Sequence, residues 1–286
     1  MPITVKDLGY VYGKGTPFET AALRGVDFTI EDGAFVGVMG HTGSGKSTLI
    51  QLLAGLLEPT DGRVLLDGDD INSEEYERSR LRKKVGVVFQ YPECQLFENT
   101  VFKDVAFGLK HLGLSREQVR QRIKWALETT GFAYEQIQKQ SPMGLSGGEK
   151  RRVAIAGVLA VKPEILIMDE PIAGLDPTGR DAFMELVKRL NESGTTIIMI
   201  SHNSDYIGAF ARRILVLDKG RLVMDGGTRQ VFQDLKGLAS LGLRPSQSRE
   251  IVELLNARGM DLSPEIITCE ELSRAVVGKM KGGGCP

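Results

Sequence analysis

The segment of residues 40–47 constrains this chain more than any other, because its sequence GHTGSGKS matches the phosphate-binding pattern G-x-x-x-x-G-K-[ST]. Residues 35–39 just before it are apolar and bounded by glycines, which predicts a buried strand. Leucines follow it at helical spacing, namely Leu49, Leu52, Leu53, Leu56 and Leu57. Because strand, loop and helix come in the required order, a phosphate-binding loop is favoured over a glycine-rich turn with a solvated lysine.

Each part of this segment has a defined chemistry. Glycines allow backbone N–H groups to wrap the α- and β-phosphates, and the helix that follows adds its positive N-terminus. Lys46 is expected to reach the β- and γ-phosphates, and the Ser47 hydroxyl can ligate Mg²⁺. The predicted nucleotide-binding residues here are Gly40, His41, Thr42, Gly43, Ser44, Gly45, Lys46, Ser47 and Thr48.

Composition narrows the class of protein. The 286 residues are enough for one large α/β domain and a small appendage, and the net charge of −1 provides no excess of basic side chains for nucleic acid. The N-terminus lacks the apolar core of a signal peptide, and no run approaches the roughly 18 apolar residues of a membrane span. We therefore expect a soluble or peripheral protein whose three cysteines, Cys94, Cys269 and Cys285, are reduced thiols.

Two adjacent acids follow a second apolar run. Residues 165–168 read as a buried strand that delivers Asp169 and Glu170 at its end. On a solvated loop such a pair would be unremarkable. At the mouth of a buried strand, in a chain with a phosphate-binding loop, the pair indicates Mg²⁺ ligation by Asp169 and water activation by Glu170.

Two other polar residues follow strand patterns. Gln90 comes after residues 85–89 and could reach a metal or a water, or only cap its strand. His202 comes after residues 195–200 and could reach a γ-phosphate, although a lone histidine is usually an ordinary surface or core residue. Because the carboxyl ends of strands line the binding crevice of open α/β sheets, both residues are candidates for the site.

A glycine-rich helix start lies at residues 145–149, whose sequence is LSGGE. Ser146 and Glu149 have the spacing of a capping box, which alone would account for both residues. Gly147 and Gly148 lower the stability of the helix, and a capping box does not require glycine at these positions. Bare N–H groups at this helix start would suit an anion.

The first 30 residues read as an opening sheet. Strands are predicted for residues 3–5 and 22–30, separated by an irregular segment at residues 10–17. Tyr12 in this segment could stack on a nucleotide base or pack on the sheet.

Helical patterns dominate two later parts of the chain. An insert with a solvated charged face is predicted at about residues 91–160. Short helices follow residue 228, and residues 281–286 are expected to form a mobile tail.

Taken together, these stretches resemble the ATP-binding-cassette (ABC) ATPases over nearly all of residues 1–235. Residues 40–47 look like the Walker A loop, residues 165–169 like Walker B, and residues 174–176, which end in Asp176, like the D-loop. The family signature is matched by Leu145, Ser146, Gly147, Gly148 and Glu149. Two positions depart from the family pattern, since Glu149 stands where Gln is common and Ile172 where Thr is common. Neither departure removes a catalytic group.

The resemblance implies roles for individual residues. Tyr12 would stack on adenine, Glu170 would be the catalytic glutamate, and His202 would be the switch histidine. Gln90 would be the Q-loop glutamine and would join Ser47 and Asp169 at Mg²⁺. ATP would be bound between two cassettes, with the phosphate-binding loop of one facing the signature of the other.

The resemblance also implies a fold and its boundaries. The expected class is α/β, a P-loop NTPase of the ABC type with a RecA-like core sheet, an antiparallel β subdomain and a helical insert. The ATP-binding domain would span residues 1–235. A small helical appendage would span residues 236–286.

Within the family, residues 90–98 (QYPECQLFE), residues 104–108 and residues 151–160 are similar to the energy-coupling-factor (ECF) transporter ATPases. The stretch PECQLF looks more like the second of their two paralogous ATPase subunits. This resemblance implies a prokaryotic protein at the cytoplasmic face of the membrane that uses ATP and Mg²⁺ to power uptake of a vitamin or transition metal ion. Its partners would be a second ATPase, more readily a paralogue than another copy, a membrane scaffold and a separate substrate-binding membrane subunit.

Other functions are less compatible with the sequence. The same chemistry would serve a conventional importer fed by a binding protein. A soluble cassette protein acting on DNA or ribosomes usually carries long coiled coils, zinc insertions or two cassettes, and none is readable here. A kinase or GTPase with only a phosphate-binding loop would not need the signature helix and His202 together.

Overall fold

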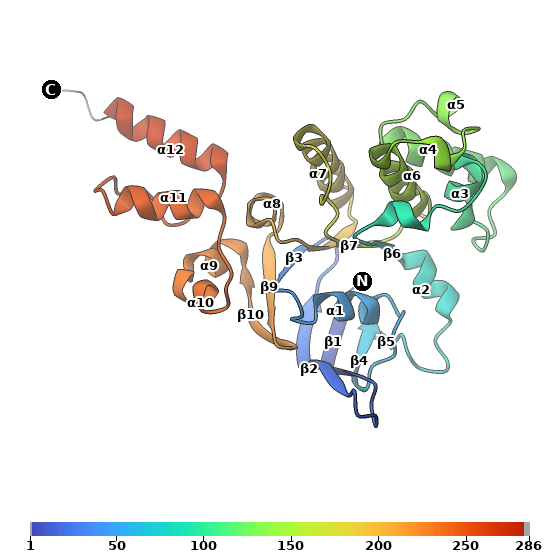
Figure 1. Ribbon diagram of the computed structural model, residues 1–286, viewed down its shortest axis with the longest axis horizontal. Coiled ribbons are helices and arrows are strands. Elements are labelled where there is room, and N and C mark those ends of the chain that lie inside the picture. Colours follow the sequence, from blue (N-terminus) through green and yellow to red (C-terminus); the bar gives the residue numbers. More distant parts are fainter. Residues whose placement is uncertain (1, 283–286) are drawn as a thin grey trace.

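The computed structural model describes residues 2–282, with side chains through residue 280, and its largest element is a six-stranded sheet (Figure 1). The strand order is β10-β9-β3-β8-β7-β6, and only β10 runs antiparallel to its neighbour. The strands are β3 (Phe35–Met39), β6 (Val85–Val88), β7 (Ile165–Asp169), β8 (Thr196–Ile200), β9 (Arg213–Asp218) and β10 (Arg221–Gly227). The carboxyl ends of β3, β6, β7 and β8 therefore meet at one edge, where the candidate site residues were predicted.

Alternate side chains of the central strands enter two different hydrophobic cores. In β8, Ile197 and Met199 belong to the core shared with the helical insert, whereas Ile198 and Ile200 belong to the core shared with the antiparallel sheet. The side chains of β3, β7 and β8 are buried on both faces of the sheet, so each of these strands reads as an apolar run rather than an alternating one. This arrangement explains why the runs were recognisable in the sequence.

A four-stranded antiparallel sheet, in the order β2-β1-β4-β5, packs on the hydrophobic core that contains Ile198 and Ile200. Its strands are β1 (Ile3–Tyr12), β2 (Thr20–Ile30), β4 (Asp61–Leu66) and β5 (Asp69–Asp70). The prediction of an irregular segment from residue 10 is wrong for its first three residues, because Tyr12 pairs with Thr20 at the end of β1. Cross-strand pairing, which no local pattern reveals, extends β1 beyond the predicted residues 3–5.

Two helices flank these sheets. Helix α1 (Lys46–Leu53) follows the phosphate-binding loop, and α2 (Arg78–Lys84) precedes β6. The predicted continuation of α1 to Leu57 is wrong, since Gly55 adopts a φ of 65° and Leu56 is 59% exposed. A left-handed glycine just past the last turn ends the helix.

The helical insert packs against the hydrophobic core that contains Ile197 and Met199. It contains the 3₁₀ helix η1 (Pro92–Gln95), α3 (Val101–Phe107), α4 (Arg116–Thr129), α5 (Tyr134–Ile137), the 3₁₀ helix η2 (Pro142–Gly144) and α6 (Gly147–Ala160). One face of α4 is apolar and packs inward, because Ile123, Ala126 and Leu127 are buried. The opposite face is solvated as expected, except that Arg122 reaches back to donate to the Val161 carbonyl at 2.7 Å.

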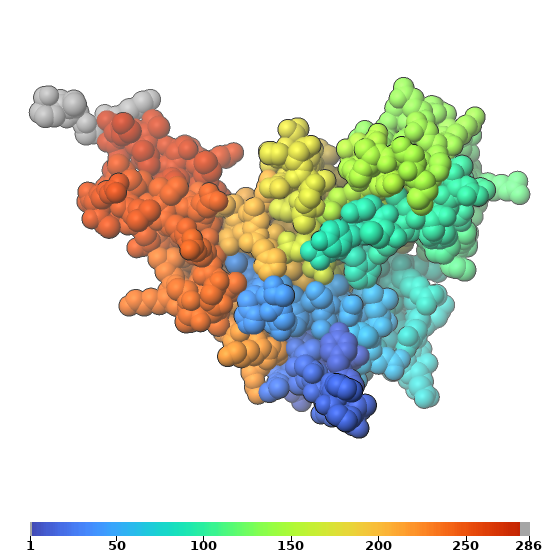
Figure 2. All heavy atoms as spheres, in the orientation of Figure 1, coloured from blue at the N-terminus to red at the C-terminus, as the bar shows by residue number. Residues whose placement is uncertain are grey.

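The remaining helices are α7 (Pro177–Glu192), α8 (Ser204–Phe210), α9 (Thr228–Gln233), α10 (Leu235–Ser240), α11 (Gln247–Asn256) and α12 (Cys269–Gly282). The last two project from the body of the molecule and share a small core of their own (Figure 1). Figure 2 shows a hollow between these helices and α7, whose lining includes Glu185, Tyr206 and Ile251. Residues 283–286 of the predicted tail, with Cys285, lie outside the described residues, and residues 281 and 282 are helical. Among the described helices, none is both long and apolar enough to cross a membrane.

Candidate functional site

The phosphate-binding loop closes around its own lysine. Lys46 is the first residue of α1, is only 8% exposed, and its Nζ donates to the carbonyl oxygens of Gly40 at 2.7 Å and His41 at 2.8 Å. Burial lowers the pKa of Lys46, while the nearby charges of Glu170 and Asp169 act to raise it. A buried ammonium held by neutral carbonyls gains energy when an anionic oxygen comes within reach, which is what a phosphate group provides.

Two of the loop glycines are required by the protein's own packing. A β-carbon at Gly40 would lie 2.4 Å from the Leu217 carbonyl oxygen, and one at Gly45 would lie 2.6 Å from that of Ala22. Both glycines also have positive φ values of 152° and 105°. The loop thus lies tightly between β9 and β2. The glycines are therefore needed for packing within the protein, and not only for the approach of backbone N–H groups to phosphate that the motif suggested. Gly43 has a φ of 80° with open space around it.

The other loop residues differ in exposure. Thr42 is exposed, Ser44 is fully buried, and the buried Thr48 has its hydroxyl 3.2 Å from that of Tyr12. The Tyr12 ring is 42% exposed and touches Tyr10 edge-on, with ring centroids 4.8 Å apart. Tyr12 therefore lies beside the phosphate-binding helix at the end of β1 and is not a core residue of the sheet.

His41 is held by two acceptors. Its Nδ1 lies 2.7 Å from the carbonyl oxygen of Thr42, and its Nε2 lies 2.7 Å from Asp218 Oδ1. Two acceptors facing the two ring nitrogens favour the doubly protonated imidazole, in which both nitrogens are donors. The Thr42 carbonyl and then Asp218 accordingly raise the pKa of His41. The two contacts therefore favour the charged form of a loop residue for which the motif specifies no role.

The predicted metal ligands come together in part. The Ser47 hydroxyl donates to Asp169 Oδ2 at 3.2 Å, which joins the first turn of α1 to the end of β7. Gln90 is exposed just after β6, and within residues 2–282 no hydrogen bond joins it to Ser47 or Asp169. Burial raises the pKa of Asp169, and the contact with Ser47 opposes this shift.

Glu170 lies beside His202 at the ends of adjacent strands. The distance from Glu170 Oε1 to His202 Nε2 is 3.6 Å, and the Glu170 backbone N–H donates to the Ile200 carbonyl at 3.0 Å. Oε1 is buried without a hydrogen-bond partner among the described residues. Burial raises the pKa of Glu170 to about 7. A buried carboxylate oxygen with a pKa near neutrality is suited to accept a proton.

The signature helix begins as the capping-box spacing predicted. Ser146 Oγ accepts from the Glu149 backbone N–H at 3.4 Å, and a Glu149 carboxylate oxygen accepts from the Ser146 backbone N–H at 2.9 Å. Leu145 is buried, whereas Gly147 and Gly148 are exposed. In Figure 1, α6 is grouped with α3 and α4, apart from α1.

Asp176 of the predicted D-loop caps α7, because its Oδ1 accepts from the Gly179 backbone N–H at 2.6 Å. This contact accounts for an aspartate at the helix start without a ligand. Asp176 is nevertheless exposed to solvent.

Sequence reasoning missed three residues with contacts at the site. Asp218 pairs with His41, and the buried Arg151 of α6 contacts both Glu93 and the backbone at Glu170. Arg151 stands in the run KRR, which reads as a solvated face. Only its place two residues after the signature could have drawn attention to it.

A phosphate-binding loop after a central parallel strand, with acids and a histidine at the ends of the next two strands, defines a nucleotide-hydrolysing P-loop protein. The antiparallel sheet and the capped glycine-rich helix of the insert narrow this class to the ATP-binding cassettes. The family model described as ABC transporter matches residues 23–173. The chain belongs to the ABC transporter family and, within it, to the ECF transporter ATP-binding proteins, because curated ECF transporter ATP-binding proteins are 45% and 47% identical to it over at least 96% of each chain.

Two curated relatives carry the name energy-coupling factor transporter ATP-binding protein EcfA2. The protein of Caldanaerobacter subterraneus subsp. tengcongensis is 45% identical over 283 residues, which is 99% of each chain. That of Clostridium tetani is 47% identical over 278 residues, covering 97% of this chain and 96% of the relative. The predicted resemblance to the second ECF ATPase subunit is therefore confirmed.

Solved structures agree with the fold. The cbiO1 protein of Clostridium perfringens, described as part of the ABC transporter complex cbiONQ, is 35% identical with a TM-score of 0.73, over 89% of this chain and 98% of that one. A dimeric ATP-binding cassette bound to ADP and Pi in a post-hydrolysis state is 32% identical with a TM-score of 0.70, over 79% of this chain and 98% of that one. The predicted fold class is confirmed.

Proposed function

We propose that this chain is the ATP-hydrolysing subunit of an ECF importer, which takes up a vitamin or a transition metal ion. It would work at the cytoplasmic face of the membrane, paired with a second ATPase that is more readily a paralogue than another copy. A membrane scaffold and a substrate-binding membrane subunit would complete the transporter. The convergence of Lys46, Glu170 and His202 at the strand ends is the observation that carries the ATPase part of this proposal.

The residues divide the chemistry among themselves. Lys46 and the loop N–H groups would bind the β- and γ-phosphates, and the half-exposed Tyr12 beside α1 would stack on adenine. Glu170 would accept the proton of the attacking water through its unpartnered Oε1. His202, 3.6 Å away, would orient the same water and hold the γ-phosphate.

The oxygens of Ser47 and Asp169 fit Mg²⁺, since a hydroxyl and a carboxylate are hard ligands and lie 3.2 Å apart. Within residues 2–282 no group of three or more acidic, histidine or cysteine side chains could hold a metal. This matches Mg²⁺ rather than a dedicated protein cage, because Mg²⁺ usually takes one or two protein ligands with phosphate oxygens and water. When bound it would neutralise phosphate charge, and Gln90 would contribute a further oxygen.

The signature glycines are best explained by a group outside this chain. An added β-carbon at Gly147 or Gly148 would meet no atom within 4 Å, and neither residue has a positive φ. The fold would therefore accept alanine, and helix propensity would favour it. A γ-phosphate bound to a second cassette is such an outside group, and it would need the helix N-terminus to be bare.

Gly148→Ala is expected to lower ATP hydrolysis at least tenfold in the complex with the second ATPase, while thermal stability stays equal or rises by up to about 1 kcal/mol. The control is Gly278→Ala, which also adds a methyl group to an exposed helical glycine with open space around it. It should keep full activity. Unchanged turnover in the Gly148→Ala complex would show that the signature residues do not act at the shared site.

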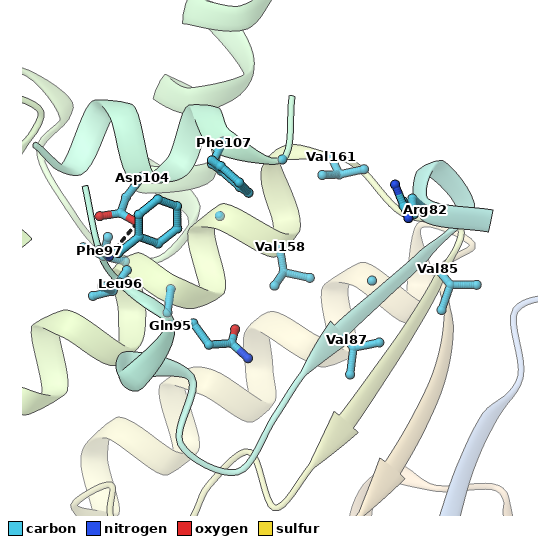
Figure 3. A pocket seen from close by; sticks show the side chains of 15 residues that line it. Arg82, Val85, Val87, Gln95, Leu96, Phe97, Asp104, Phe107, Val158 and Val161 are labelled. Carbon is cyan, nitrogen blue, oxygen red and sulfur yellow. Dashed lines mark hydrogen bonds between the residues drawn. The ribbon is translucent and has the colours of Figure 1, made fainter. Parts of the chain in front are cut away.

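An apolar groove of about 350 Å³ provides a docking place for the membrane scaffold (Figure 3). It is lined by residues of β6, α3 and α6, with Val87, Val158 and Phe107 facing it. Phe97 and Phe107 are about half exposed and pack edge-to-face, with ring centroids 4.9 Å apart, and Lys110 Nζ lies 4.4 Å from the centroid of the Phe107 ring. An amphipathic helix of the scaffold would fit such a groove with its apolar face.

The test is to tag this chain at native expression, extract membranes in mild detergent and identify what co-purifies. We expect a paralogous ATPase, a membrane scaffold and small substrate-binding membrane subunits. Phe107→Ala should reduce recovery of the scaffold severalfold, whereas Phe18→Ala, which removes an 86% exposed ring elsewhere, should not. A conventional permease pair would favour the ordinary importer, and the absence of any membrane protein would contradict a transport role.

A further inference from the structure

Arg151 is a buried charge whose partners belong to other segments of the chain. The side chain is only 5% exposed, although it stands between Lys150 and Arg152 on α6. Its Nη2 donates to the carbonyl oxygens of Glu170 at 3.2 Å and Pro171 at 2.6 Å. Burying a guanidinium is costly unless it is paired, so these contacts must largely offset the loss of hydration.

The backbone that Arg151 contacts is in an unusual conformation. Glu170 has a φ of 48°, which places a residue with a β-carbon in the left-handed region, and it directly precedes Pro171. Such a conformation costs about 1 kcal/mol or more and persists only where the surroundings fix it. Arg151 holds two successive carbonyls, that of Glu170, which is part of the peptide bond to Pro171, and that of Pro171 itself. The Glu170 backbone is thus held from two sides, by this guanidinium and by the Ile200 carbonyl, which accepts from the Glu170 N–H at 3.0 Å.

The other side of the guanidinium faces the segment after Gln90. Arg151 Nη1 lies 3.9 Å from Glu93 Oε2, in the 3₁₀ helix η1 (Pro92–Gln95) that packs on α6. This carboxylate oxygen and Arg151 Nε are both buried without a hydrogen-bond partner among the described residues. A small displacement of η1 would convert the ion pair into a direct hydrogen bond. The residues that follow η1, Leu96 and Phe97, line the docking groove.

We propose that Arg151 is a positioning residue that holds the backbone of Glu170 for catalysis and links it to Glu93 at the docking groove. The inference rests on the proposed role of Glu170 as the base. Scaffold binding in the groove shifts η1, the guanidinium redistributes its hydrogen bonds between Glu93 and the two carbonyls, and the orientation of Glu170 changes. A single side chain thereby connects the state of the membrane partner to the rate of hydrolysis.

The experiment measures kcat and KM for ATP in the assembled transporter. Arg151→Met should lower kcat at least tenfold with KM unchanged within about twofold, because the phosphate-binding loop is untouched. Arg151→Lys should have a higher kcat than Arg151→Met, because an ammonium can reach the carbonyls. Its kcat should stay below that of the parent, because a single ammonium cannot contact the carbonyls and Glu93 at once as the guanidinium does. Arg122→Met is the matched control, because it removes a similar guanidinium–carbonyl bond at the other end of α6. It should leave kcat within twofold.

Coupling to Glu93 is tested separately by a double-mutant cycle of Arg151→Lys and Glu93→Gln. We expect the combined loss of kcat to be at least threefold smaller than the product of the single losses. Multiplicative losses, an unchanged kcat for Arg151→Met, or equal losses in Arg122→Met would overturn the inference. If Arg151→Met fails to fold, wild-type kcat in Arg151→Lys would overturn it as well. The ATPase part of the proposed function fails if the parental transporter does not hydrolyse ATP or if Glu170→Gln retains its rate, and its transport part fails if no membrane protein co-purifies, so these failures are distinguishable from failure of the Arg151 inference.

Discussion

Glu170→Gln is expected to slow ATP hydrolysis by about a hundredfold or more, while ATP still binds and the two cassettes still close. The amide has nearly the shape of the carboxylic acid but cannot take a proton from water, and general-base catalysis is typically worth 10²–10⁴-fold. The contacts of Lys46 and the loop are unchanged, so binding should survive. Single-turnover hydrolysis and equilibrium ATP binding, measured on the same assembled complex, separate the two effects.

The natural control is Glu164→Gln, because Glu164 is half exposed just before β7 and far along the strand from the site. It should hydrolyse ATP at the parental rate. If Glu170→Gln did the same, Glu170 could not be the base.

Without nucleotide, the Glu170→Gln variant should be more stable than the parent at high pH. Burial raises the pKa of Glu170 to about 7, so the folded state binds a proton more tightly than the unfolded state does. That contribution is complete below pH 4.5, is lost as pH rises to 7, and corresponds to about 3 kcal/mol. Glutamine resembles the neutral acid at every pH. The variant and the parent should therefore have equal melting temperatures near pH 4.5, and the variant should melt higher at pH 8.

Strands that are buried on both faces were predictable from the sequence, because burial on both faces makes every residue of the strand apolar. Residues 165–168 and 195–200 are apolar throughout because both sides of those strands are buried, which identified the strands and the positions of Asp169 and His202 at their ends. The capping box at Ser146 is equally local, since four residues contain the whole interaction.

Contacts between distant segments were not predictable. Tyr12 lies in a strand because of its partner in β2, and the pKa of His41 is raised by the adjacent Thr42 carbonyl and also by Asp218, which is 177 residues further along the chain. Arg151 looks like its neighbours in the sequence and differs from them only in what α6 packs against. In each case the property depends on the tertiary fold and leaves no local signal.

Lys46→Ala is expected to weaken ATP binding by one to two orders of magnitude. Charge-assisted hydrogen bonds to phosphate are worth about 1.5–3 kcal/mol, which corresponds to roughly 10- to 100-fold in the dissociation constant. Equilibrium titration with ATP measures the effect. Lys124→Ala, which removes an exposed ammonium from α4, should leave affinity unchanged.

A second variant distinguishes the charge of Lys46 from its packing. The lysine stem is buried and its Nζ ties the carbonyls of Gly40 and His41 together, so alanine could also disorder the loop. Lys46→Met keeps most of the stem volume and loses only the ammonium. If charge is decisive, both variants lose affinity equally, even though the methionine variant remains as stable as the parent without nucleotide. Normal affinity in Lys46→Met would show that the loop needs a filled space there rather than a cation, and would contradict the phosphate contact.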